Sequence, residues 1–123
     1  MKVMVTGGAG FIGSHLVDKL VANGDEITVV DNFSTGRIEN LKHIQNQIEI
    51  IEGDLSELNY LRDLVKGKQL IFHLAALADI VPSIKNPKQY FKANVTGTLN
   101  LLQACVDQNI SDPRKLVKGL RFQ

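Results

Sequence analysis

A glycine-rich run near the N-terminus, residues 6–13 (TGGAGFIG), has the residue types and spacing that carry the clearest chemistry in this chain. It follows an apolar start and precedes an amphipathic segment, residues 14–23, so the pattern predicts a strand, a tight turn and a helix. Such a turn presents backbone N–H groups and a helix N-terminus to a pyrophosphate. In this interpretation Gly7 permits the turn, Gly10 lets the phosphates approach the backbone, and Gly13 lets the helix pack closely. Glycines also mark ordinary turns, but the flanking strand and helix favour dinucleotide binding.

An acidic residue closes the next predicted strand, which spans residues 26–30. Asp31 lies 18 residues after Gly13, at the distance where a carboxylate accepts hydrogen bonds from the adenosine ribose of NAD. The same charge would repel the 2′-phosphate of NADP, so we expect NAD as the cofactor. Arg37 lies close enough in sequence to offset part of that repulsion, and NADP therefore stays open as an alternative.

The third predicted strand, residues 48–51, is followed by Gly53, Asp54 and Leu55. We expect Asp54 to accept a hydrogen bond from the adenine amino group and Leu55 to pack on the ring. An ordinary turn at the end of a strand explains the same residues, so this assignment depends on the neighbouring motifs.

The fourth predicted strand, residues 69–74, ends in small residues. Leu74, Ala75 and Ala76 suit a backbone that lies against the ribose on the nicotinamide side. His73 is interpreted as a structural histidine rather than a catalyst.

Helix patterns alternate with these strands. The predicted helices lie within residues 14–23, 37–44, 57–66 and 87–108, the third with Ser56 as N-cap and the last opened by Asn86 and Pro87. Residues 75–86 are expected to be irregular. The apolar face of the long helix is predicted to bury Phe91, Val95, Leu99, Leu102, Cys105 and Val106, with Gly97 in close contact with a neighbour.

This alternation predicts an α/β fold of the Rossmann type: a doubly wound parallel sheet in the order 3-2-1-4, with helices on both faces. Residues 115–118 offer a possible short fifth strand beside the fourth. We expect a dinucleotide-binding domain over residues 1–109, then a basic tail or remnant strand over 110–123, with the substrate-binding domain absent.

Composition limits the other possibilities. The 123 residues are 44% hydrophobic and 22% charged with net charge +1, values typical of one soluble domain without a general affinity for nucleic acid. No apolar run reaches the roughly 18 residues that span a membrane. Cys105 is the single cysteine, which excludes an intrachain disulfide and favours a cytoplasmic location. The three histidines are scattered, so no metal site is expected.

Five motifs in order, in residues 6–16, 31–32, 53–55, 73–76 and 94–98, resemble the NAD-dependent epimerase/dehydratase family of extended short-chain dehydrogenases. The resemblance covers residues 1 to about 109 and looks most like the branch of UDP-glucose 4-epimerases, although decarboxylases and dehydratases share nearly all of this half. It implies oxidation of a sugar nucleotide by hydride transfer to bound NAD and return of the hydride. It also implies a homodimer contact through the helix over 87–108.

The resemblance assigns the cofactor contacts residue by residue. The glycine loop would hold the pyrophosphate. The end of the second strand would contact the adenosine ribose, the end of the third strand would contact the adenine, and the end of the fourth strand would contact the nicotinamide ribose. Asn94 would help order the site. The predicted cofactor-binding residues are Gly7, Gly10, Phe11, Ile12, Gly13, Asp31, Asn32, Asp54, Leu55, Leu74, Ala75, Ala76 and Asn94.

The catalytic pattern of that family is missing from these residues. Its chemistry needs a Tyr-x-x-x-Lys pair in which the tyrosine serves as the base. Tyr60 is followed four residues later by Leu64, and Tyr90 by Asn94. We therefore expect an NAD-binding half that does not turn over sugar nucleotides on its own. A non-catalytic nucleotide-sensing or scaffold protein, and an NADP-dependent reductase, are the alternatives.

Overall fold

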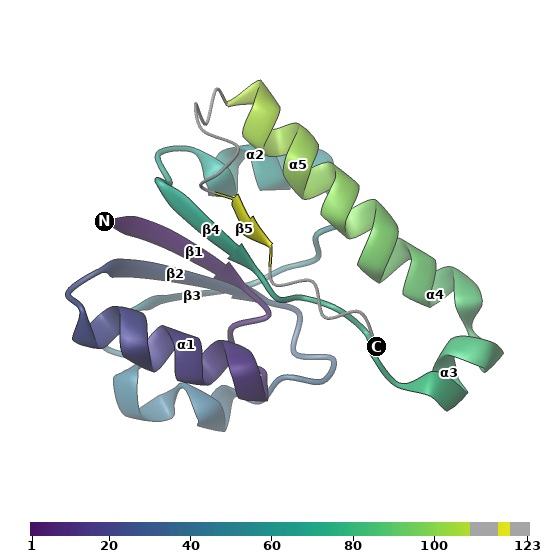
Figure 1. The fold of residues 1–123 in the computed structure, drawn as a ribbon, viewed down its shortest axis with the longest axis horizontal. Coiled ribbons are helices and arrows are strands. Elements are labelled where there is room, and N and C mark those ends of the chain that lie inside the picture. Colours follow the sequence, from purple (N-terminus) through teal and green to yellow (C-terminus); the bar gives the residue numbers. More distant parts are fainter. Residues whose placement is uncertain (109–115, 119–123) are drawn as a thin grey trace.

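The computed structural model describes residues 1–108 and 116–118 of the chain (Figure 1). Its centre is a parallel sheet in the order β3-β2-β1-β4-β5. The strands are β1 (Lys2–Thr6), β2 (Glu26–Asp31), β3 (Glu49–Glu52), β4 (Leu70–His73) and β5 (Leu116–Lys118). The predicted order 3-2-1-4 is confirmed, and the possible fifth strand forms beside β4, with Leu116 opposite Ile71. The rest of the predicted tail lies outside the described residues, and the domain boundary at residue 109 stays a prediction.

Helices cover both faces of the sheet, as predicted. On one face lie α1 (Phe11–Ala22) and two 3-10 turns, η1 (Ile38–Asn40) and η2 (Lys42–Ile44) (Figure 1). On the other lie α2 (Leu58–Val65) and α5 (Gly97–Asp107). Two short helices, α3 (Ile80–Lys85) and α4 (Pro87–Phe91), follow β4, and a π-helical turn, η3 (Lys92–Thr96), joins α4 to α5 in one continuous rod.

The strand period of two residues builds two separate cores. Val3 and Val5 of β1 pack with α1, whereas Met4 between them packs with α2 and α5. All three side chains are fully buried. A strand that is apolar at successive positions and buried on both sides is what a covered parallel sheet requires.

The sequence predicts that one apolar stripe of the long helix is buried, and this prediction is wrong for most residues of the stripe. Five of its apolar side chains are exposed, with exposed fractions of 38–71%: Phe91, Val95, Leu99, Leu102 and Val106. Only Cys105 of the predicted set is buried, together with Leu101 and Ala104. The helix has two apolar faces, and the face with the smaller residues packs inward.

Gly97 and the π turn account for this choice of face. A Cβ on Gly97 would lie 3.2 Å from Cβ of Leu55, closer than most Cβ contacts, so the predicted close contact is confirmed and a larger residue would push the helix and Leu55 apart. The π turn replaces i→i+4 bonds by i→i+5 bonds. A side-chain stripe on one face of α4 therefore does not continue on the same face of α5. A sequence pattern with a helical period of 3.6 residues does not predict this change.

Three smaller predictions also need correction. Residues 75–86 are not wholly irregular, because they contain α3, in which Pro82 occupies the first turn, where its missing N–H costs no intrahelical bond. The helix expected within residues 37–44 forms the two 3-10 turns instead. The N-cap of α2 is Glu57 rather than Ser56.

Candidate functional site

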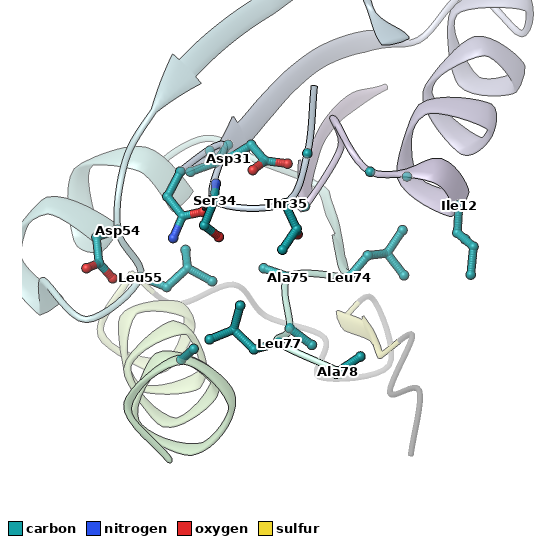
Figure 2. Close-up of a pocket in the computed structure, with 18 of the residues that line it drawn as sticks. Ile12, Asp31, Ser34, Thr35, Asp54, Leu55, Leu74, Ala75, Leu77 and Ala78 are labelled. Atoms are coloured by element: carbon teal, nitrogen blue, oxygen red, sulfur yellow. Dashed lines mark hydrogen bonds between the residues drawn. The ribbon is translucent and has the colours of Figure 1, made fainter. Parts of the chain in front are cut away.

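A cavity of about 460 Å³ opens at the carboxyl ends of the central strands, where the sheet order reverses between β1 and β4 (Figure 2). Every predicted cofactor-binding residue except Asn94 lines it. It also has eight lining residues outside the predicted set: Val30, Ser34, Thr35, Gly36, Gly53, Leu77, Ala78 and Ala93. Motifs that are far apart in sequence thus meet at one site, as expected for ligand sites in open α/β sheets.

The glycine turn is shaped by backbone contacts. Gly7 has φ of 71°, and a Cβ there would lie 2.7 Å from the backbone nitrogen of Ala75. A Cβ on Gly13 would overlap the carbonyl oxygen of Gly7 and lie 2.8 Å from Cα of Gly8. Gly13 is therefore needed for contact with the turn itself, whereas the sequence motif predicts that it serves helix–sheet packing.

The N-terminus of α1 supplies hydrogen-bond donors to the cavity. Gly10 is its N-cap residue and gives no side-chain cap, and the first turn contains no acidic residue. The first N–H groups of a helix have no intrahelical acceptor, and the helix dipole makes this end positive. Phe11, Ile12 and Gly13 belong to this turn and line the cavity. An anion placed here would satisfy those donors.

Asp31 is held at the wall of the cavity by two backbone groups. Its Oδ2 accepts from the Ala9 nitrogen at 3.0 Å and its Oδ1 from the Phe33 nitrogen at 2.8 Å. The residue is only 8% exposed. Each carboxylate oxygen retains a further lone pair, so the side chain can accept two more hydrogen bonds in a fixed orientation. A vicinal diol, such as that of a ribose, matches this pair of acceptors.

The segment after Asp31 closes over the glycine turn. The Ala9 carbonyl accepts from the Arg37 nitrogen at 3.0 Å and from Nδ2 of Asn40 at 2.8 Å. A Cβ on Gly36 would lie 2.9 Å from Oδ2 of Asp31. The sequence predicts a helix within residues 37–44 of this segment and no ligand contact, so its location directly after Asp31 is the only signal that it lines the site.

The described residues that line the cavity include two carboxylates, Asp31 and Asp54, and no lysine or arginine. Arg37 lies instead in a neighbouring open groove with Phe33 and Ile50. Among these described residues, a diphosphate would therefore meet backbone donors and the helix dipole rather than a cation. A 2′-phosphate next to Asp31 would find no cationic partner among these lining residues, which favours NAD over NADP.

Asn94 supports the cavity from behind. Its Oδ1 accepts from the Leu77 nitrogen and its Nδ2 donates to the Leu77 carbonyl, both at 2.8 Å. This pair of bonds fixes the segment after β4 to the π turn of the long helix. The neighbouring Ala93 contributes to the lining, whereas Asn94 does not. Such a position fits an ordering role more closely than direct contact with a cofactor.

Neither tyrosine reaches the cavity lining. The Tyr60 hydroxyl donates weakly to the Glu52 carbonyl at 3.5 Å, and its ring packs against Gly53. Tyr90 lies on α4 and is absent from the lining residues.

Within residues 1–108 and 116–118, no group of three His, Cys, Asp or Glu side chains is placed to hold a metal ion. None of the helices in these ranges has both the length and the apolar character of a membrane-spanning segment.

Three features define a Rossmann-type dinucleotide-binding protein. They are a parallel sheet whose strand order changes direction between β1 and β4, a glycine turn at a helix N-terminus and a carboxylate after the second strand. The family model described as GDP-mannose 4,6 dehydratase matches residues 4–119. The chain belongs to this family, the NAD-dependent epimerases and dehydratases of sugar nucleotides.

Individual relatives span several reactions. The chain is 47% identical over 104 residues to UDP-glucuronic acid decarboxylase 1 of Arabidopsis thaliana, covering 83% of this chain and 23% of that protein. It is 36% identical over 112 residues to the UDP-glucose 4-epimerase of Lactobacillus helveticus, covering 89% and 33%. The first relatives are therefore matched over about a quarter of their length.

Solved structures agree with the fold. The UDP-glucose 4-epimerase of Thermus thermophilus in complex with NAD superposes with a TM-score of 0.80 at 38% identity, covering 89% of this chain and 35% of that one. The dTDP-glucose 4,6-dehydratase of Streptomyces venezuelae, solved with NAD, gives 0.83 at 35% identity, covering 89% and 37%.

Proposed function

We propose that this chain binds NAD and forms the cofactor-binding part of an enzyme that acts on sugar nucleotides. One observation carries the proposal: an uncapped helix N-terminus and a doubly anchored Asp31 line the same cavity. The first suits a pyrophosphate and the second a ribose diol. Family membership and the complex of the Thermus thermophilus epimerase with NAD support the same cofactor.

Each wall of the cavity has a separate task in this proposal. The first turn of α1 binds the pyrophosphate, Asp31 and Asn32 bind the adenosine ribose, and Asp54 and Leu55 border the adenine. The small residues after β4 leave room for the nicotinamide ribose. When bound, NAD supplies a hydride acceptor that can return the hydride.

Turnover of a sugar nucleotide needs groups that these 123 residues do not contain. A base is required for the sugar hydroxyl, and neither Tyr60 nor Tyr90 has a lysine four residues later. We therefore propose that this polypeptide holds NAD without converting sugar nucleotides by itself. A sugar nucleotide would bind only with a further domain.

The reaction branch is a finer proposal. The motifs favour a UDP-glucose 4-epimerase. The higher identity to a UDP-glucuronic acid decarboxylase, 47% against 36%, makes decarboxylation the second candidate. Both assignments use the same cavity for NAD, so the cofactor proposal does not depend on the choice between them.

Calorimetric titration of the purified chain with NAD and with NADP tests the cofactor proposal. We expect NAD to bind more tightly, and a ligand at 100 times its dissociation constant to stabilise the fold by about 2.7 kcal/mol. Failure to bind NAD at millimolar concentration would refute the proposal, and tighter binding of NADP would refute the role of Asp31. In a parallel assay with UDP-galactose and NAD, formation of UDP-glucose would contradict the absence of turnover.

The exposed stripe of the long helix supports a homodimer as the proposed assembly. Its five side chains follow one another at intervals of three or four residues, which is the period of a helix face that packs on another helix. A cytoplasmic location stays a prediction that rests on the single cysteine.

A further inference from the structure

A buried histidine connects the two segments that support the wall of the cavity after β4. His73 ends β4, is 3% exposed and does not line the cavity. Its Nδ1 lies 2.7 Å from Oγ1 of Thr6 on β1, and its Nε2 lies 2.8 Å from Oγ1 of Thr98 on α5. The ring therefore spans from the central strand to the long helix through the end of β4.

The neighbouring hydrogen bonds assign a proton to Nε2 of the ring. The Thr98 hydroxyl donates to the Asn94 carbonyl at 2.7 Å, so toward His73 it can only accept, and Nε2 must carry a hydrogen. The Thr6 hydroxyl accepts from the Ala75 nitrogen at 3.3 Å and has its own hydrogen left for Nδ1. A ring that carries a hydrogen on Nε2 satisfies both contacts.

Both ends of this chain of hydrogen bonds reach the cavity. On one side the Thr6 hydroxyl holds the N–H of Ala75, which is a lining residue. On the other side Thr98 holds the backbone of Asn94, whose side chain makes both bonds to Leu77, a second lining residue. The His73 ring bonds to both threonines and so joins the two sides.

We propose that His73 is a positioning residue for the cofactor cavity: its ring, which bonds to Thr6 and to Thr98, fixes the spacing between the backbone at Ala75 and at Leu77. This inference rests on the proposed binding of NAD, because the backbone that His73 positions forms the cavity wall proposed to lie next to the nicotinamide-side ribose. A side chain that only filled space would leave Thr6 and Thr98 free to move independently. The ring couples them, so a shift of the long helix is transmitted to the end of β4.

Binding of NAD to the full chain and to a set of variants tests the proposal. His73→Leu fills the space of the ring with an apolar side chain but loses both bonds, and we expect the dissociation constant of NAD to rise about tenfold. Thr98→Val removes only the Nε2 partner and should give a similar loss. The double variant should bind no worse than His73→Leu alone, because both changes break one connected chain.

A matched control separates positioning from loss of stability. Thr28 is also a buried strand residue, 4% exposed, with a side-chain bond to Glu49 at 2.9 Å, and it does not line the cavity. Thr28→Val should lower the stability of the fold while leaving NAD affinity within about twofold of the wild type. Binding of NAD by His73→Leu at nearly the wild-type affinity, or additive losses in the double variant, would overturn the proposal.

A second readout does not need the cofactor. The Leu77 amide should lose protection from hydrogen exchange in His73→Leu and retain it in Thr28→Val, and the ring nitrogen shifts of His73 should show the form protonated at Nε2. Unchanged protection of Leu77 overturns the positioning role. A wild-type chain that fails to bind NAD refutes the proposed function, whereas the exchange measurement still decides the role of His73.

Discussion

Replacement of Asp31 by asparagine is the sharpest test of the cavity, because it removes a charge and one acceptor without changing the size of the side chain. In the wild type each carboxylate oxygen accepts one backbone N–H, from Ala9 and from Phe33. An asparagine can keep only one of these bonds, and its NH₂ group must then face the other N–H. The change therefore acts on the fold and on the ligand site together.

The magnitude follows from these two contacts. A hydrogen bond to a charged group contributes about 1.5–3 kcal/mol, so Asp31→Asn should destabilise the fold by about 2 kcal/mol. A domain of this size has about 5–15 kcal/mol of stability, and the variant should remain folded. It also loses one acceptor for a ribose hydroxyl, so we expect the dissociation constant of NAD to rise about 10- to 100-fold. NADP should lose less, because the repulsion of its 2′-phosphate disappears.

Urea unfolding measures the first effect, and calorimetric titration with NAD and NADP measures the second. Asp54→Asn is the matched control: Asp54 lines the same cavity, is exposed, and accepts a single backbone bond from Ser56 at 2.9 Å. It should weaken NAD binding less than about tenfold and leave the ratio of NAD to NADP affinity unchanged. A folded Asp31→Asn variant with an unchanged ratio would refute the assignment of Asp31 to the ribose.

Three further outcomes are expected. Gly13→Ala should destabilise the fold by about 1–3 kcal/mol, as overpacking does, and abolish measurable NAD binding in calorimetry; normal affinity would contradict the turn geometry. Burial raises the pKa of the Cys105 thiol from 9.0 to about 11. A thiol reagent at about pH 8 should therefore react slowly with the native protein and rapidly with protein unfolded in urea. The stability that the protonated thiol contributes to the fold should be lost as pH rises from 9.0 to about 11. Leu99→Lys should lower the mass of the assembly measured by light scattering while the urea midpoint stays nearly unchanged, and an unaltered assembly would exclude this helix face as the dimer contact.

The sequence predicts the strands and the meeting of the predicted residues other than Asn94 at one cavity, because both depend on short-range rules. Consecutive apolar positions in a strand cannot all be buried unless both faces of the sheet are covered, and the order of motifs along parallel strands places their ends at one edge. These rules alone predict that Asp31 lies at the end of β2, on the edge of the sheet where the motifs meet. They do not predict that the Ala9 nitrogen holds its carboxylate, because this bond joins segments 22 residues apart and depends on the geometry of the loop.

The long helix shows where this reasoning stops. Two apolar faces compete for burial, and the larger hydrophobic side chains of the stripe through Leu99 predict the wrong one. The structure buries Gly97 and Ala104 instead, because small residues let α5 approach α2 and Leu55 closely. Period and hydrophobicity identify a face, but not the distance at which it can pack.

The same helix then explains why Asn94 is better understood as a support than as a cofactor contact. The π turn places Asn94 toward the segment after β4, where the oxygen of its side-chain amide accepts from the Leu77 nitrogen and the amide nitrogen donates to the Leu77 carbonyl. A regular helix would give neighbouring residues another orientation, so the turn that upset the burial prediction also sets the position of the cavity wall. π turns occur often at functional sites, and here the deviation has a structural consequence that can be measured. Loss of Asn94 should disturb Leu77 in the same way as loss of His73, since both residues act through one chain of hydrogen bonds.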